Sequence, residues 1–338
     1  MSNIQIGRTF DQTTIDSTGS FLVQQLELLE KTIHMPLQSF TYMRDVPFRT
    51  DVTMAHDFSS YTIHNIAATG GVDSGKKNFI GKDTSNVPNV SIDVGKVQSP
   101  LIPWGSTLNY SIFELESSML LGQNIDEMKF EALRRKYQQD IDQMVYIGDT
   151  TVTMPSGVSA YGLFNNPNMT ESSIVATGAS LSTLWASKTP DEILNDVNAL
   201  LNAVWKNTGY TRCPTRLLIS PTAYAYIATA RVSSAGNVSV MTYVENNSIS
   251  IKNNGVPLQM APVKWLLGTN NGNTSGVQAT DGMYAYSDTY DVVRYPLVPI
   301  VGSPVQYRGF DQIRPYYAKL GVIESVYVEA TGFRYGIA

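Results

Sequence analysis

The chain has few of the residues on which enzymes, metal sites and disulfide-bonded folds depend. Its 338 residues include a single cysteine, Cys213, and three histidines, His34, His56 and His64. One cysteine excludes an internal disulfide framework and a zinc site built from cysteines. No base stands near Cys213 in the sequence, so we expect a small packed residue rather than a nucleophile. His56 and His64 can share a strand face, but two ligands make a poor metal site, so we expect solvated or interface histidines.

Charge and long apolar runs are also scarce. Charged residues make up 16% of the chain, against about 25% in an ordinary soluble domain. The net charge is −5 and the isoelectric point is about 5.3. A dedicated nucleic-acid-binding module is usually basic, so this balance argues against one, although it does not exclude a shell that encloses nucleic acid. No apolar run reaches the ~18 residues of a membrane span, and the first residues lack a signal-peptide core. We therefore expect no membrane partner.

Motifs of catalysis and cofactor binding are absent as well. Neither G-x-S-x-G nor H-E-x-x-H occurs. Gly70, Gly75 and Lys76 match G-x-x-x-x-G-K of a phosphate-binding loop, but Lys77 follows where Ser or Thr would bind magnesium. No helix start follows that would face a phosphate with its dipole. We interpret this stretch as a flexible basic tip, and we expect neither an enzyme nor a cofactor.

Tyrosine is what the chain has in abundance. It contains 19 tyrosines, and 43% of its residues are hydrophobic. A surface that is poor in charge and rich in tyrosine is typical of extensive protein–protein contact. A monomer with a polar, uncharged surface fits the same composition equally well.

The strongest pattern is a long helix expected over residues 124–146. Asn124 can cap its N-terminus, with Glu127 three positions later, and Gly148 ends it. Its length would be roughly 35 Å. Apolar residues at spacings of three and four form a narrow stripe, so we expect the helix to lie on another element. The stripe consists of Phe130, Leu133, Tyr137, Ile141 and Met144. Charged residues are expected on the other faces: Glu127, Glu131, Arg134, Arg135 and Asp142.

The order of elements around this helix resembles the major capsid proteins of tailed bacteriophages. An expected strand ending at residues 113–116 (FELE) precedes the helix, and residues 146–149 (YIGD) and 162–165 (GLFN) follow it. The resemblance implies an α+β fold of the Hong Kong 97-like type, with the long helix as the spine of a peripheral domain. It also implies an N-terminal arm (1–45), an extended hairpin loop with flanking strands (46–112), a peripheral domain (113–185), an axial domain (186–310) and a C-terminal return to the peripheral domain (311–338).

The N-terminal third is expected to consist of an arm and a long hairpin. Residues 21–34 have helical periodicity, and this helix packs either on a neighbouring subunit or on its own domain. Strand patterns occupy residues 52–67, with a bulge or bend at residues 59–60, and return through Val90, Ile92 and Val94. Two strands alone are marginal in water, so the hairpin needs a surface to lie on. In the family that the chain resembles, that surface is the adjacent subunit.

The tip of the hairpin, residues 69–86, is rich in glycine and is expected to be mobile. It carries Lys76, Lys77 and Lys82. These three lysines are our candidates for contacts with acidic groups of another subunit.

The second half begins with a strongly marked helix. Thr189 and Glu192 form a capping box around Pro190, and Gly209 ends the helix. Its broad apolar face consists of Ile193, Val197, Leu200, Leu201, Val204 and Trp205. A short strand at 216–220 and a helix capped by Ser220 follow. We expect strands and loops over 231–303, a tight turn at 253–255, an exposed loop at 268–282, prolines that limit regular structure near 296–304, and a last strand at 321–330.

The resemblance implies a structural function. The chain would be a major capsid protein that forms hexamers and pentamers and assembles into an icosahedral shell around double-stranded DNA, without sequence-specific binding. Separate scaffolding, portal and decoration proteins would be further partners. The location would be the virion capsid, with assembly in the bacterial host cytoplasm. Two alternatives are an encapsulin-type nanocompartment, which has the same fold, and a hydrolase or lyase without a recognisable motif.

Overall fold

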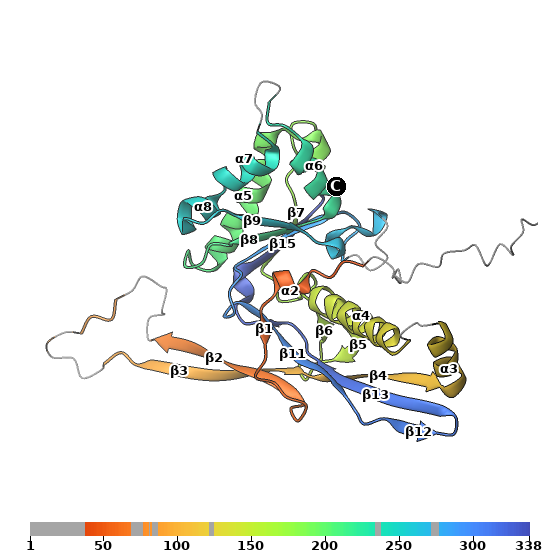
Figure 1. Ribbon diagram of the computed structural model, residues 1–338. Coiled ribbons are helices and arrows are strands. Elements are labelled where there is room, and N and C mark those ends of the chain that lie inside the picture. The colour runs from red at the N-terminus through yellow and green to blue at the C-terminus, as the bar shows by residue number, and fades with distance from the viewer. Residues whose placement is uncertain are drawn as a thin grey trace, which may run out of the picture.

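The computed structural model describes residues 38–68, 77–80, 82, 87–121, 125–233, 238–271 and 277–338. Figure 1 shows a long, flat sheet region below and a second sheet covered by helices above. A two-stranded hairpin extends from one end of the lower part. The mixture of helices and sheets confirms the α+β class. Most of the expected N-terminal arm, including the helix expected at residues 21–34, lies outside the described residues.

The lower part is built on a six-stranded sheet whose strands come from both halves of the chain. Its order is β1-β11-β13-β12, with β4 paired to β13 and β14 paired to β11. The strands are β1 (Phe48–Arg49), β4 (Ile102–Ser111), β11 (Val293–Gly302), β12 (Gln306–Arg308), β13 (Asp311–Leu320) and β14 (Glu324–Ser325). Strands β4 and β13 pair along their whole length. They form the platform for the long helix.

Helix α4 (Ile125–Tyr146) confirms the long helix expected from the apolar stripe. The stripe residues Leu133, Tyr137, Ile141 and Met144 are buried, and Phe130 is partly exposed. Tyr137 packs on Trp104 of β4, with 5.0 Å between the ring centroids. Asn124, the expected N-cap, lies outside the described residues.

The turn that follows α4 depends on two glycines. Gly148 ends the helix with a φ of 77°, which favours glycine. A Cβ on Gly162 would lie 2.3 Å from the backbone nitrogen of Ile147, so only glycine fits there. Asn165 accepts a hydrogen bond from the Gly162 N–H and donates to the Ile147 carbonyl, both at 2.7 Å. The GLFN segment thus closes the helix end, next to the short strands β5 (Gly148–Thr153) and β6 (Ser159–Tyr161).

The expectation that residues 113–116 end a strand is wrong, because they lie in helix α3 (Ile112–Leu121). Strand β4 stops at Ser111, which pairs with Asp311, the first residue of β13. The partner strand has therefore run out at this point. The residues that follow, rich in Leu, Glu and Met, continue in a conformation that needs no partner strand.

The upper part contains a five-stranded sheet of order β7-β15-β10-β8-β9. The strands are β7 (Glu171–Ile174), β8 (Arg216–Ile219), β9 (Gln259–Pro262), β10 (Gly282–Tyr286) and β15 (Thr331–Tyr335). Helix α5 (Pro190–Asn207) packs on this sheet, and α6 (Pro221–Thr229) follows β8. Short 3₁₀ turns lie at Trp185–Ser187, Lys264–Leu266, Thr269–Asn271 and Val328–Ala330.

The helix signals at Thr189 and Ser220 are confirmed. The Thr189 N–H donates to the Glu192 carboxylate at 2.8 Å, and the Glu192 N–H donates to the Thr189 hydroxyl at 3.4 Å. Ser220 caps α6 by accepting from the Ala223 N–H. The face of α5 that was expected to be buried is buried at Ile193, Val197, Leu200, Leu201 and Val204, whereas Trp205 is half-buried.

The expectation of strands and loops over 231–303 is wrong for two helices. Helices α7 (Val240–Asn247) and α8 (Ile249–Asn254) occupy the segment before the expected tight turn. Gly255 has a φ of 70° and ends α8, so residues 253–255 form a helix end instead of a tight turn between strands. Val240 and Val244 are buried four residues apart, a helical spacing that packs this segment on the upper part's core.

Three further segments differ from expectation. Strand β11 continues through Pro296 and Pro299, and a register shift between Val298 and Val301 accommodates the second proline. The described residues of the loop at 268–282 are only partly exposed, since Asp281 is buried and accepts from the Gly268 N–H at 2.8 Å. The strand expected at 321–330 is interrupted: only β14 and a 3₁₀ turn lie there, and the last strand is β15.

Each of the two larger sheets takes strands from several of the segments that the resemblance implies. Strand β7, within 113–185, and strand β15, within 311–338, both belong to the five-stranded sheet. Strand β11, within 186–310, belongs to the six-stranded sheet. The chain therefore passes between the two parts more often than three simple segments would require.

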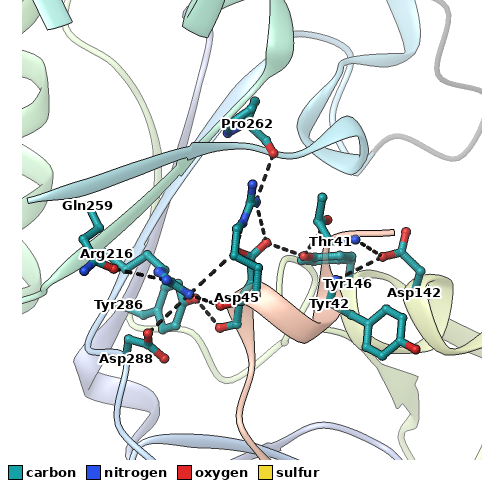
Figure 2. Close-up of polar contacts among 11 residues, drawn as sticks. Thr41, Tyr42, Asp45, Asp142, Tyr146, Arg216, Gln259, Pro262, Tyr286 and Asp288 are labelled. Atoms are coloured by element: carbon teal, nitrogen blue, oxygen red, sulfur yellow. Dashed lines mark hydrogen bonds and ion pairs between the residues drawn. The ribbon is translucent and has the colours of Figure 1, made fainter. Parts of the chain in front are cut away.

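A four-residue helix, α2 (Tyr42–Asp45), lies between the two parts, and Asp142 of α4 holds its first residues (Figure 2). The Asp142 carboxylate accepts from the backbone N–H groups of Thr41 and Tyr42 at 3.0 and 3.3 Å. It also accepts from the Trp265 indole at 2.7 Å. The expectation that Asp142 lies on an outer face of the helix is wrong, because α2 and Trp265 cover that face and bury it completely.

Asp45, at the other end of α2, connects the same helix to the upper sheet (Figure 2). Arg44 binds the Asp45 carboxylate through two N–H groups at 2.7 and 2.9 Å, and it donates to the Pro262 carbonyl of β9 at 3.1 Å. The Tyr146 hydroxyl of α4 donates to the carboxylate, and the Tyr286 hydroxyl of β10 donates to the Asp45 carbonyl. Helix α2 is therefore bonded to both parts.

Burial keeps the two tyrosine hydroxyls in these contacts protonated. Burial, reinforced by the charge of Asp45, raises the pKa of both Tyr146 and Tyr286 well above the usual value. Both phenols therefore stay protonated donors at ordinary pH. Arg216 of β8 adds to the same connection by donating to the Arg44 carbonyl and pairing with Asp288 at 3.2 Å. We call the contacts of α2 with the two parts the joint.

We expect the α5 face to dominate the stability of the upper part. Leu200 is fully buried, so Leu200→Ala should lower the free energy of unfolding by about 2–5 kcal/mol. Asn202→Ala, on the exposed side of the same helix, should change it by no more than about 0.5 kcal/mol. Chemical denaturation of the folded subunit measures both, and equal effects would contradict the packing of α5.

We expect the joint to fail when Asp142 loses its charge. Asp142→Asn should lower the free energy of unfolding by about 3–5 kcal/mol, because buried donors lose an ionic acceptor. Glu131→Gln on the same helix breaks only a partly exposed contact with Arg135 at 3.9 Å and should cost about 0–0.5 kcal/mol. Denaturation midpoints compare the two, and a mild Asp142→Asn would mean that this carboxylate does not hold α2.

Candidate assembly surfaces

The hairpin β2 (Phe58–Ala68) and β3 (Val90–Pro100) has one unbroken register, from Phe58↔Pro100 to Ala68↔Val90. Ser59 and Ser60 pair with consecutive residues of β3. The bulge expected at these two serines is therefore wrong. Residues 52–57 precede the strand. The apolar residues shift from even to odd positions near these serines because β2 begins there, and not because the strand is irregular.

One face of the hairpin is apolar and uncovered. Ile66 lies opposite Ile92, and Val94 lies opposite His64, so these side chains share a face. Ile66, Val90, Ile92 and Val94 are 58–66% exposed. The other face is more polar, with Asn65 opposite Asp93 and Ala67 opposite Ser91. A hairpin with an apolar face that no described residue covers needs a partner to cover it.

Among the described residues, the contacts between the hairpin and the six-stranded sheet lie near the root of the hairpin. Ser59 and Ser99 are buried there, and the Tyr61 hydroxyl donates to the Ser325 carbonyl at 3.4 Å. Burial raises the pKa of Tyr61 to about 12. Beyond this point the strands project away from both sheets (Figure 1).

Only part of the expected tip is described. Lys77 and Lys82 are exposed, and the Lys77 ammonium lies 6.0 Å from the ring centroid of Phe79. Phe79 and Ile80 are also exposed. Lys76 lies outside the described residues, as do Gly70 and Gly75 of the phosphate-loop-like stretch, so the expected mobility of residues 69–86 is not tested.

A second apolar surface lies at the opposite end of the six-stranded sheet (Figure 1). It is formed by α3, β12 and the turn between β12 and β13, and α3 meets this turn where the Ile112 N–H donates to the Phe310 carbonyl at 3.0 Å. Its members are 67–89% exposed: Phe113, Met119, Leu120, Tyr307 and Phe310. We call this set the α3 patch. The sequence interpretation missed it because residues 113–116 were assigned to a strand.

The candidate catalytic and metal-binding residues are not brought together. His56 precedes β2, accepts from the Thr53 N–H at 3.0 Å, and does not share a strand face with His64. His34 lies outside the described residues. Cys213 is buried, which confirms the packed residue, and burial raises the pKa of its thiol to about 11.

Among the described residues, no group of three or more His, Cys, Asp or Glu could hold a metal ion. Within the same ranges, no helix is long and apolar enough to cross a membrane. An open cavity of about 640 Å³ at the end of α5 is lined by Lys206, Arg212, Glu329 and other residues, none of them His or Cys.

Comparison with known proteins identifies relatives of this fold. The capsid of the myovirus phage XM1 matches with a TM-score of 0.72 and 18% identity, over 94% of this chain and 99% of that one. The capsid of the native GTA particle matches with a TM-score of 0.57 and 10% identity, over 98% and 100%. The match to Microbacterium phage Oxtober96 has a TM-score of 0.58 and 12% identity, over 93% and 97%. A search of curated proteins finds no match.

The family comparison covers most of the sequence. The family model described as major capsid protein matches residues 75–337, which include β3, the α3 patch, α4, the five-stranded sheet and every strand of the six-stranded sheet except β1. The chain therefore belongs to the major capsid protein family, has the Hong Kong 97-like fold, and is a structural protein of a capsid shell.

Proposed function

We propose that copies of this chain assemble into rings of six and five, and the rings into an icosahedral shell around double-stranded DNA. The observation that carries this proposal is the uncovered apolar face of the hairpin, together with the α3 patch at the other end of the molecule. Two different surfaces at opposite ends favour head-to-tail contacts, which close into rings when the rotation between copies permits. The work of the chain is mechanical, without catalysis or a cofactor.

The two parts of the subunit have separate roles in this proposal. The six-stranded sheet with α4 forms the peripheral domain, and the five-stranded sheet with α5 to α8 forms the axial domain at the ring centre. The N-terminal arm and the hairpin clasp neighbouring copies. In this division, strands β7 and β15 belong to the axial domain and β11 belongs to the peripheral domain, because each lies in the corresponding sheet.

Other partners follow from the same proposal. Separate scaffolding, portal and decoration proteins complete the particle, and the DNA is enclosed without sequence-specific contacts, in keeping with a net charge of −5. Assembly takes place in the host cytoplasm, and no membrane is involved. An encapsulin-type compartment has the same fold, but the family match favours the capsid. No described site favours a hydrolase or lyase.

The hairpin tip has an adjusting role in this assembly. We expect Lys76, Lys77 and Lys82 to meet acidic groups on a neighbour, where each exposed pair contributes about 0–1 kcal/mol. The strands supply most of the contact, because burying four exposed apolar side chains contributes more free energy than three exposed lysine pairs.

We expect a charge on the apolar face of the hairpin to prevent assembly without unfolding the subunit. Ile92→Asp places a carboxylate in a contact that must lose water, whereas in the free subunit the side chain is 66% exposed. The matched control is Ser91→Asp, its neighbour on the polar face. Circular dichroism should find both variants folded, and light scattering with negative-stain microscopy should find particles only for the control. Wild-type particles from Ile92→Asp would refute the proposed contact.

We expect the tip to modulate assembly. Replacing residues 69–86 by a short Gly-Ser turn should leave the secondary structure unchanged, because the described core lies elsewhere. Assembly should weaken or give aberrant particles, as measured by light scattering over a range of salt concentrations. Loss of folding would make the hairpin part of the core, and shells of normal form and stability would remove the tip from the contact.

A further inference from the structure

A buried carboxylate lies at the root of the hairpin. Glu324, in the two-residue strand β14, is 1% exposed although it is charged. Its carboxylate accepts from Arg294 Nε of β11 at 2.7 Å and from Arg49 Nη1 of β1 at 3.4 Å. The Ser59 hydroxyl, in the second residue of β2, donates to it as well. One side chain therefore joins the hairpin to two strands of the six-stranded sheet.

The two arginines extend the same network along the start of β2. Arg49 Nη1 also donates to the Ser59 hydroxyl at 3.0 Å and to the Ser60 carbonyl at 3.1 Å. The guanidinium of Arg294 lies 5.7 Å from the ring centroid of Tyr61. Three consecutive hairpin residues, Ser59 to Tyr61, are thus held by the partners of Glu324.

Because this network lies at the root of the hairpin, a small rotation there displaces the far end by a large distance. The register pairs eleven residues of each strand, so the hairpin is about 35 Å long. A change of ~10° at the root would move its far end by roughly 6 Å, more than the spacing of neighbouring strands. The apolar face could not meet the same surface of a neighbour after such a change.

Stability alone is a weak reason for a buried ion cluster. Removing charges from water offsets much of what their attraction contributes, and apolar residues of similar size stabilise a core equally well. Charge-assisted hydrogen bonds differ from apolar contacts in having a fixed direction. A cluster of such bonds at the root of the hairpin therefore sets the angle between the hairpin and the six-stranded sheet.

We propose that Glu324 is a positioning residue that fixes the direction in which the hairpin leaves the six-stranded sheet. It acts through Arg49, Ser59 and Arg294, and it does not itself contact the neighbouring copy. This inference rests on the proposed function, because the direction matters for the contact between subunits. Through that direction, Glu324 sets the curvature of the shell.

The test compares Glu324→Gln with the unaltered chain by the distance between two spin labels in unassembled subunits. The labels are placed at Asn65→Cys on the polar face of the hairpin and at Thr107→Cys on β4, both exposed. Cys213 is buried and is left in place. The unaltered root should give one narrow distance distribution, and Glu324→Gln should widen it at least about twofold, since the arginines lose their ionic partner.

Glu171→Gln is the matched control. Glu171 also pairs with an arginine, Arg334 at 2.9 Å, but in the five-stranded sheet. It should leave the distance distribution unchanged. Ser59→Ala removes one donor to Glu324 and serves as the milder variant should Glu324→Gln not fold, with a smaller widening expected. An unchanged distribution in a folded Glu324→Gln or Ser59→Ala subunit overturns the proposal.

A second readout separates this inference from the proposed function. Glu324→Gln subunits should form particles with a wider range of diameters in negative-stain images, whereas Glu171→Gln particles should match the unaltered chain. Particles of wild-type diameter despite a widened distance distribution would overturn the link to curvature. If the unaltered chain formed no particles, the proposed function would fail, yet the distance measurement would still decide whether Glu324 directs the hairpin.

Discussion

The hairpin β2–β3 carries an apolar face that its own chain does not cover within the described residues, and this constraint governs how the rest of the subunit is used. Two strands satisfy their own backbone pairing along one register, but they cannot bury Ile66, Ile92 and Val94 between themselves. The cost of leaving these side chains in water is removed only when another surface arrives. A subunit of this shape is incomplete in its apolar burial, so association follows from its architecture.

A projecting arm is useful only on a body that holds its shape. Helix α2 connects the two sheets through buried polar contacts, with Asp142 on one side and Asp45 with Tyr286 on the other (Figure 2). These contacts have directions, unlike apolar packing, and the tyrosines that make them stay protonated because burial raises the pKa of each hydroxyl. The joint and the Glu324 cluster therefore work in the same way. In both, buried ionic groups fix an angle between elements that apolar packing alone would not fix.

Local sequence patterns predicted the helices whose ends are determined by capping residues next to them in the sequence. The capping box at Thr189, the cap at Ser220 and the stripe of α4 each specified a helix that the structure contains. Elements that depend on distant strands were missed. Residues 113–116 form a helix because β13 begins at Asp311 and offers no further partner, and Glu324 is buried because two arginines from other strands surround it. The only local sign was a charged residue within an apolar run, which indicates a buried partner without naming it.

For the same reason, the sequence predicted only part of the candidate assembly surfaces. Alternation predicted the strands of the hairpin, but which side chains share its uncovered face came from the register. The most direct measurement is the labelling rate of a thiol at Ile92→Cys, in free subunits and in assembled particles. Cys213 stays silent because it is buried and its thiol has a pKa of about 11. Burial against a neighbour predicts a rate at least about tenfold lower in particles, and equal rates in the two states would contradict the account.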